Sequence, residues 1–161
     1  MKIRSLISKD RTKLRAVLVE TDAFSPEEID VAMELIDIVL TDENQGDYKI
    51  QCAVDDRDQP VGYICYGPVP MTQGTFDLYW VAVDPSFQGR GAGSKLLMFL
   101  EEAVKETEGR MILADTSSIP QYENTRKFYL QKGFREVARV PDYYSPGNDR
   151  ITYCKRIQVK G

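Results

Sequence analysis

The sequence predicts an α/β fold in which a mixed β-sheet carries helices on both faces. Three observations lead to this prediction. Strand-like and helical segments alternate along the chain, a glycine-rich loop joins one strand directly to a helix, and 161 residues suit one domain with one core. We therefore expect residues 1–161 to form a single domain.

The first third of the chain is predicted to contain one short strand and two helices. Residues 2–8 are partly apolar and suit a strand, and Asp10 or Thr12 is placed to cap a first helix. The second helix is predicted to begin at Ser25-Pro26-Glu27-Glu28, which combines a capping serine, a proline at the first helical position and a glutamate three residues after the serine. Its apolar residues recur at helical spacing: Ile29, Met33, Ile36 and Leu40.

The middle of the chain is predicted to form three strands and a helix. Residues 48–54 and 61–66 flank the turn 58–60 and are typical of a hairpin. Residues 75–83, rich in aromatic and β-branched side chains, predict the third strand. A helix over 94–107 follows, and its predicted buried stripe is Leu96, Leu97, Leu100, Ala103 and Val104.

The last third is predicted to contain a strand, a helix and a hairpin. Residues 111–116 form a short apolar run, and the helix over 122–132 ends before Gly133, a favourable residue just beyond a helix. Strands over 135–140 and 150–157 flank a turn at 145–148.

Composition excludes several classes of function. No apolar run is long enough to span a bilayer, and the N-terminal residues lack the apolar core of a secretory signal. The net charge of −4 speaks against a nucleic-acid binder. The chain has no histidine, and its three cysteines form neither a disulfide framework nor a metal-type spacing. We expect a cytoplasmic protein without a metal ion.

The segment from Asp84 to Ser94 contains three glycines and joins a predicted strand to a helix. Glycines allow successive N–H groups to point at one spot, and a helix N-terminus adds free donors, so the segment suits a pyrophosphate. Arg90 and Lys95 add positive charge. Two other phosphate loops do not fit: the Walker spacing is wrong, and Ser94 stands where a dinucleotide fingerprint has its last glycine.

The pattern Gln88-x-x-Gly91-x-Gly93, after Val-Asp-Pro, resembles the signature of the GNAT superfamily of N-acetyltransferases. The segment 122–134, which ends in Phe-Tyr, three residues and Gly-Phe, is similar to the second motif of that family. The resemblance implies a mixed, mostly antiparallel, splayed sheet of about seven strands with about four helices. It also implies acetyl-CoA as the co-substrate.

By the same resemblance, two backbone N–H groups on the strand 75–83 contact the cofactor: Val81 polarises the acetyl carbonyl and Val83 holds the pantetheine arm. The residues expected to bind the pyrophosphate are Gln88, Gly89, Arg90, Gly91, Ala92, Gly93 and Ser94. The chain departs from the family at Tyr122, where the family usually has an asparagine that contacts the cofactor.

Candidates for proton transfer are a phenol and two carboxylates, since histidine is absent. Tyr129 stands at the family position that protonates the departing thiolate, although it also suits a core aromatic. Asp77 is the predicted base, and it shares a strand face with Tyr79 and Val81. Asp115 is a competing base, and either aspartate also suits a solvated strand end. Cys65 better suits a buried strand than an acyl-enzyme.

The resemblance implies a primary amine as the acceptor. Residues 17–47 contain ten acids and neither lysine nor arginine. The resemblance implies that this segment borders the acceptor groove, where a negative rim attracts cations. Phe24, Tyr79, Tyr143 and Tyr144 are candidate aromatic walls. A cationic small molecule is the predicted acceptor. Acetylation of a protein N-terminus or a lysine, a non-catalytic acyl-CoA-binding module, a plain solvated acidic face and a homodimer are left open.

Overall fold

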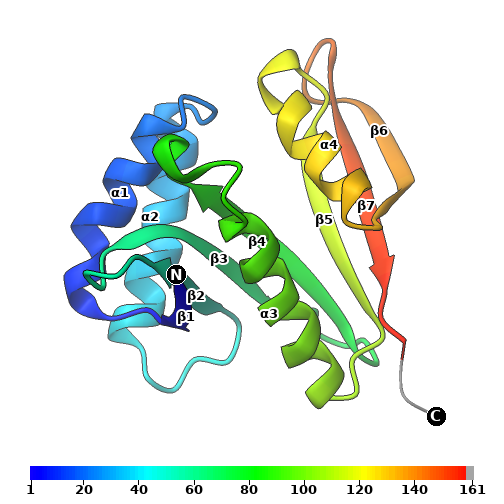
Figure 1. Cartoon of the computed structure of the whole chain (residues 1–161). Coiled ribbons are helices and arrows are strands. Elements are labelled where there is room, and N and C mark those ends of the chain that lie inside the picture. Colours follow the sequence, from blue (N-terminus) through cyan, green and yellow to red (C-terminus); the bar gives the residue numbers. More distant parts are fainter. Residues whose placement is uncertain (159–161) are drawn as a thin grey trace. The chain divides into compact units, whose positions relative to one another are not determined.

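The structure, a computed structural model, describes residues 1–158 (Figure 1). Within this range the chain forms seven strands, four α-helices and three short 3₁₀ helices. The strands are β1 (Lys2–Ser5), β2 (Lys49–Val54), β3 (Pro60–Pro68), β4 (Thr75–Val83), β5 (Met111–Ser117), β6 (Arg135–Ser145) and β7 (Asn148–Arg156). The helices are η1 (Ser8–Asp10), α1 (Arg11–Glu20), α2 (Pro26–Thr41), η2 (Pro85–Phe87), α3 (Ala92–Glu106), η3 (Pro120–Tyr122) and α4 (Glu123–Gln131).

The strands form one sheet in the order β1-β2-β3-β4-β5-β7-β6. The β1–β2, β2–β3, β5–β7 and β6–β7 pairs are antiparallel, whereas β4 and β5 are parallel. A parallel pair needs a crossover connection, and α3 lies in that connection. The predicted mixed, mostly antiparallel α/β sheet with seven strands and four α-helices is therefore confirmed.

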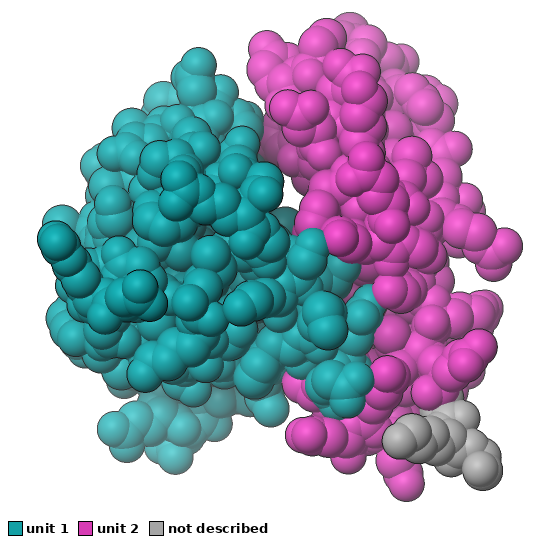
Figure 2. All heavy atoms as spheres, viewed as in Figure 1, with its two compact units in different colours: residues 1–68, 79–102 teal, residues 69–78, 103–161 magenta. Residues whose placement is uncertain are grey.

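The chain divides into two compact units, which Figure 2 colours separately. Unit 1 comprises residues 1–68 and 79–102, and unit 2 comprises residues 69–78 and, of the described residues, 103–158. Both β4 and α3 have residues in each unit.

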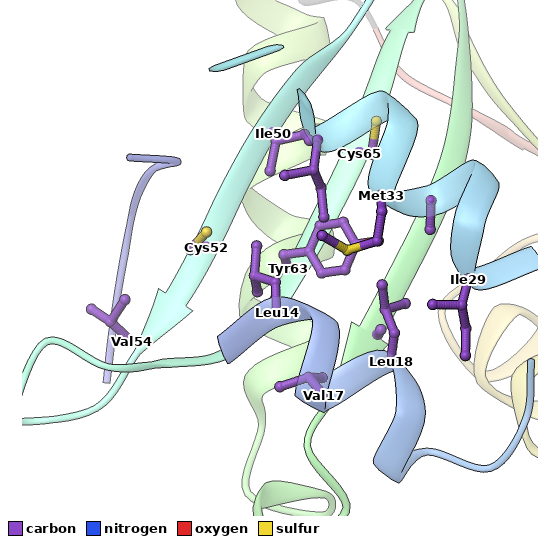
Figure 3. Close-up of a cluster of buried hydrophobic side chains, with 13 residues drawn as sticks. Leu14, Val17, Leu18, Ile29, Met33, Ile50, Cys52, Val54, Tyr63 and Cys65 are labelled. Atoms are coloured by element: carbon purple, nitrogen blue, oxygen red, sulfur yellow. The ribbon is translucent and has the colours of Figure 1, made fainter. Parts of the chain in front are cut away.

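The core of unit 1 lies between α1 and α2 on one side and β2, β3 and β4 on the other. Figure 3 shows the Tyr63 ring among the side chains of Leu14, Met33 and Ile50. Ile29, Met33 and Ile36 of the predicted apolar stripe are buried here, which confirms the periodicity of the second helix. At its start, the Ser25 hydroxyl accepts from the Glu28 N–H at 3.2 Å and the Glu28 carboxylate accepts from the Ser25 N–H at 3.1 Å. The predicted capping box is present.

The strand ends differ from the sequence-based prediction at both ends of the chain. β1 ends at Ser5 instead of residue 8, and η1 begins at Ser8. Asp10 directly precedes α1, but its carboxylate accepts from Arg4 and from the Ile7 N–H rather than from the helix. β6 extends to Ser145, so the β6–β7 hairpin is longer than predicted.

In unit 2, β5, β7 and β6 pair side by side, and the rings of α4 pack on Tyr153 of β7. The helix ends as expected. Gly133 adopts φ = 90°, and the N–H of Phe134 donates to the carbonyl of Tyr129 at 3.0 Å. That turn fixes the helix end at which Tyr129 lies.

Candidate functional site

The glycine-rich loop of unit 1 begins where β4 ends. The Asp84 carboxylate accepts from the Ser86 N–H at 2.9 Å and from the Ser86 hydroxyl at 2.8 Å, which sets the first turn, η2. Gly89 and Gly91 then adopt φ of 77° and 86°, a region that side chains disfavour. Nothing in the structure lies within 4 Å of a Cβ added at either glycine. These glycines are therefore explained by backbone conformation, and their outer side is open.

The predicted pyrophosphate residues fall into two groups. Gln88, Gly89, Arg90 and Gly91 are exposed, whereas Gly93 and Ser94 are half-buried and Ala92 is 1% exposed. The side chain of Ala92 belongs to the core, so this residue can offer a ligand only its backbone. Because α3 begins at Ala92, the loop delivers its free N–H groups at a helix N-terminus, as the sequence predicts.

Three cations lie around this loop in unit 1. The Arg90 guanidinium lies 5.2 Å from the centre of the Phe87 ring, and the Lys95 Nζ donates to the Met1 carbonyl at 3.1 Å. Lys13 of α1, which the sequence did not suggest, has its Nζ 3.5 Å from the Asp84 carboxylate. Positive charge therefore accompanies the backbone donors.

Successive side chains of β4 point to opposite faces of the strand, so the predicted residues, which are two positions apart, share one face. Leu78 and Ala82 are buried, whereas Asp77, Tyr79, Val81 and Val83 are half-buried or exposed. The pairs of β4 with β5 involve Thr75, Phe76 and Asp77, and Val81 lies four residues beyond the last of them.

Two of the predicted aromatic walls make ring contacts within unit 1. Phe24 meets Trp80 edge-on with centroids 5.0 Å apart, and Tyr79 meets Tyr48 with centroids 5.2 Å apart. Such pairs fix the rings and stabilise the connection between α1 and α2 as well as the residues before β2.

The two candidate bases lie on the same face of unit 2. Asp77 is opposite Leu113 in the parallel β4–β5 pair, so Asp115, two residues farther on β5, points to the face of Asp77. Burial raises the pKa of Asp77, and the nearby Asp115 carboxylate raises it further. Asp115 is exposed and accepts a hydrogen bond of 2.5 Å from the hydroxyl of Thr152 on β7. Thr152 is a partner that sequence reasoning missed, because only strand pairing reveals it.

Tyr129 is buried in an aromatic cluster of unit 2, 4% exposed. Its ring centroid lies 5.2 Å from that of Phe134 and 5.8 Å from that of Tyr153. Burial raises the pKa of Tyr129 and the charge of Asp115 adds to this, so the phenol stays protonated at neutral pH. Tyr129 is thus a core aromatic, as one of the two predictions has it, and its role as a proton donor stays a prediction.

Arg126 fixes the start of the same helix. Its Nη1 donates to the carbonyls of Ser117 and Ile119, both at 2.8 Å, and so ties α4 to the end of β5. These two hydrogen bonds were not predicted from the sequence, since their acceptors are backbone atoms.

The remaining predicted candidates are a cysteine of the core and a pair of tyrosines near the β6–β7 turn. Cys65 is fully buried, and burial raises the pKa of its thiol to about 12, which opposes thiolate chemistry. Tyr143 and Tyr144 form an edge-on pair with centroids 4.9 Å apart, and Arg150 lies 4.5 Å from the centre of the Tyr143 ring. Within residues 1–158 no group of three or more histidine, cysteine or acidic residues could hold a metal ion. No helix in the same range could cross a membrane.

Comparisons with known proteins agree with these features. The model of the acetyltransferase (GNAT) domain matches residues 47–136, which include β4, the glycine-rich loop, Asp115 and Tyr129. No curated protein sequence gives a significant match.

Solved structures match nearly the whole chain. A crystal structure from Desulfovibrio desulfuricans, described as an acetyltransferase of the GNAT family, is 40% identical, with 98% of this chain and 99% of that chain covered and a TM-score of 0.90. An aminoglycoside 6′-N-acetyltransferase complexed with coenzyme A is 19% identical, with coverage of 100% and 99% and a TM-score of 0.76. The ribosomal-protein-S18-alanine N-acetyltransferase from Escherichia coli is 22% identical, with coverage of 99% and 96% and a TM-score of 0.72. The last two likenesses show a shared fold.

Proposed function

The chain belongs to the GNAT family of acetyltransferases, and from that premise we propose that it transfers an acetyl group from acetyl-CoA to the primary amine of a cationic small molecule. The GNAT family uses acetyl-CoA. The observation that carries the choice of acceptor is the pair of carboxylates, Asp77 and Asp115, on one face of the sheet in unit 2. The acidic segment of residues 17–47 supports it.

In this proposal the open glycine-rich loop holds the pyrophosphate of the co-substrate. The backbone N–H groups from Gly89 to Ser94, with the positive end of α3, donate to the phosphate oxygens, except that of Arg90, which donates to the Phe87 carbonyl. The N–H of Gln88 likewise donates within the loop, to the Pro85 carbonyl. On β4, the N–H of Val83 holds the pantetheine arm. Acetyl-CoA supplies an acyl thioester, which an uncharged amine attacks.

Three groups of this chain serve the reaction. A cationic acceptor arrives as an ammonium ion, and Asp77 takes a proton from it, directly or through a water molecule. The N–H of Val81 donates to the carbonyl oxygen while negative charge develops there. As the new C–N bond forms and the C–S bond breaks, the acylated nitrogen releases its surplus proton to solvent, and Tyr129 donates its own proton to the leaving sulfur. The protonated Asp77 and the phenolate then exchange protons with solvent.

A second acceptor class has its own observation in its favour. The Tyr143–Tyr144 pair with Arg150 provides aromatic surface and a cation next to the β6–β7 turn, which suits a peptide. Acetylation of a protein N-terminus is therefore the alternative to test.

The experiment has two arms. Free CoA release is measured with a panel of polyamines, amino sugars, basic and neutral peptides, and anionic amines; the proposal requires turnover with cationic small molecules above that with peptides. Acetyl-CoA should also raise the melting temperature, and Gly91→Glu should abolish that rise. Gly46→Glu is the matched control, because it adds the same side chain at an open position of unit 1. Preference for peptides would move the acceptor to the second class. If no amine is turned over but acetyl-CoA still raises the melting temperature, the protein is a non-catalytic acyl-CoA-binding module.

A further inference from the structure

A buried carboxylate lies directly before the loop proposed to bind an anion. Asp84 is 5% exposed, and its N–H donates to the Val61 carbonyl at 2.7 Å, so the residue is anchored to β3. Its carboxylate holds Ser86 by two hydrogen bonds. The same side chain that shapes the first turn of the loop therefore introduces a negative charge near the place where phosphates are expected.

That carboxylate is ionised. Burial by itself raises the pKa of Asp84, but hydrogen bonds from the Ser86 N–H and hydroxyl, together with Lys13, outweigh burial and lower it. Two negative groups closer than about 10 Å repel each other even at 0.1 M salt, and a buried charge is screened less than an exposed one. A negative charge at this point opposes the binding of a diphosphate unless a cation compensates for it.

Lys13 is the cation that meets Asp84. It projects from α1, more than 70 residues before the loop in sequence, and its Nζ lies 3.5 Å from the second carboxylate oxygen, Oδ2. The N–H and hydroxyl of Ser86 both donate to Oδ1, so Ser86 and Lys13 contact different oxygens of the carboxylate. The hydrogen bonds shape the loop, and the ion pair cancels the charge.

We propose that Lys13 is an electrostatic determinant of coenzyme A binding, which acts by neutralising Asp84 beneath the diphosphate loop. The inference rests on the proposed loop and adds a residue from α1 to the site. It explains why a carboxylate is tolerated next to an anion site.

The dissociation constant of CoA, measured by calorimetry, tests this with charge-changing variants. Lys13→Met should weaken CoA by about three- to tenfold, and Lys13→Arg should bind as the native protein does. Asp84→Asn keeps an oxygen that can accept from Ser86 and should bind CoA equally or more tightly. In the Asp84→Asn background, Lys13→Met should return the CoA affinity to about the native value, because the double variant has the same net charge at this pair as the native protein. Lys9→Met is the matched control, because Lys9 forms an ion pair with Asp58 in the same unit, and it should change nothing.

The phosphates of the ligand distinguish this role from a structural one. Dephospho-CoA, which retains the diphosphate, should show the same loss with Lys13→Met, whereas S-acetylpantetheine, which has no diphosphate, should show none. Native-like CoA affinity in Lys13→Met, or an equal loss for S-acetylpantetheine, overturns the inference. If Asp84→Asn does not fold, the comparison of Lys13→Met with Lys13→Arg decides. If Gly91→Glu loses CoA binding but Lys13→Met does not, the role of Lys13 is refuted and the proposed loop stands. If Gly91→Glu binds CoA as the native protein does, the proposed loop itself is refuted.

Discussion

Asp77 and Asp115 carry the same side chain in two different surroundings. Asp77 is half-buried, and burial raises its pKa; Asp115 is exposed and bound to the Thr152 hydroxyl. A carboxylate with a raised pKa is the better proton acceptor, and the charge of the neighbouring Asp115 adds to the effect of burial on the pKa of Asp77. The environment thus favours Asp77 as the base and Asp115 as the group that tunes it.

The pH profile of kcat/KM tests this division. Asp77 must be ionised to accept a proton, and because burial and the Asp115 charge raise its pKa, activity should fall as the pH drops through a value above the ordinary range of an aspartate. Asp77→Asn should lower kcat/KM and remove that acidic limb. Asp115→Asn should cost less and shift the limb to lower pH, since the charge that raises the pKa of Asp77 is gone. A larger loss in Asp115→Asn, or an unchanged limb in Asp77→Asn, would assign the base to Asp115.

Tyr129→Phe tests the phenol as the proton donor. The ring packs against Phe134 and Tyr153, and phenylalanine preserves this packing, so acetyl-CoA affinity and melting temperature should change little. Loss of the proton donor should lower kcat by about 10- to 1,000-fold. Rapid-mixing kinetics of CoA release gives kcat, and calorimetry gives the affinity. A variant with native kcat would return Tyr129 to a purely structural role.

At the scale of the elements, local chemistry was readable from the sequence and long-range chemistry was not. The Ser25–Glu28 capping box, the stop at Gly133 and the loop at Gly89–Gly91 each depend on neighbours within a few residues, and all three are present. By contrast, Arg4 of β1 binds Asp10 and the distant Asp58. Such a network has no local pattern, so it could not be predicted.

The hydrogen bonds from Arg126 of α4 to the end of β5 lead to a prediction about the stability of the protein. Arg126→Ala removes two hydrogen bonds and leaves the carbonyls of Ser117 and Ile119 without their donor. We expect a loss of about 1–3 kcal/mol in the free energy of unfolding and a lower kcat, because α4 carries Tyr129. Chemical denaturation measures the first effect. Lys127→Ala is the control: its exposed ion pair with Glu123 should contribute less than about 1 kcal/mol. Equal losses in the two variants would show that the two hydrogen bonds have no special role.

For the whole molecule, the sequence predicted the fold class and two motifs, and it left undecided which residues act together. Both motifs lie within residues 47–136, which the model of the GNAT domain matches. The contact of Lys13 with Asp84 in unit 1, and separately that of Thr152 with Asp115 in unit 2, each depends on elements that are distant in sequence. The expectation of a single domain over residues 1–161 stays a prediction, as do cytoplasmic location and oligomeric state.

The ten acids of residues 17–47 can now be divided by what they contact. Glu28 belongs to the capping box, Asp37 pairs with Arg11, and Asp42 accepts from the Asn44 N–H. These three acids have local structural roles. Asp22 and Glu27 are exposed near the start of α2, and Asp22 adopts φ = 53°, which asparagine also tolerates. The hypothesis that the segment attracts a cationic acceptor therefore concerns residues such as Asp22 and Glu27, and Glu28 must be left intact in any test.

Salt dependence decides between attraction of substrate and simple solubility. If the acidic segment attracts a cationic acceptor, kcat/KM should fall clearly between about 0.05 and 0.3 M salt, because the Debye length falls below about 10 Å in that range. The double variant Asp22→Asn, Glu27→Gln should raise KM for the acceptor and flatten this dependence, with KM for acetyl-CoA unchanged. The double variant Asp56→Asn, Glu106→Gln removes the same charge from exposed positions outside the segment and should keep the native dependence. If both double variants behave alike, or if kcat/KM for a cationic acceptor does not change with salt, the segment is a solvated face and the choice of acceptor rests on Asp77 and Asp115.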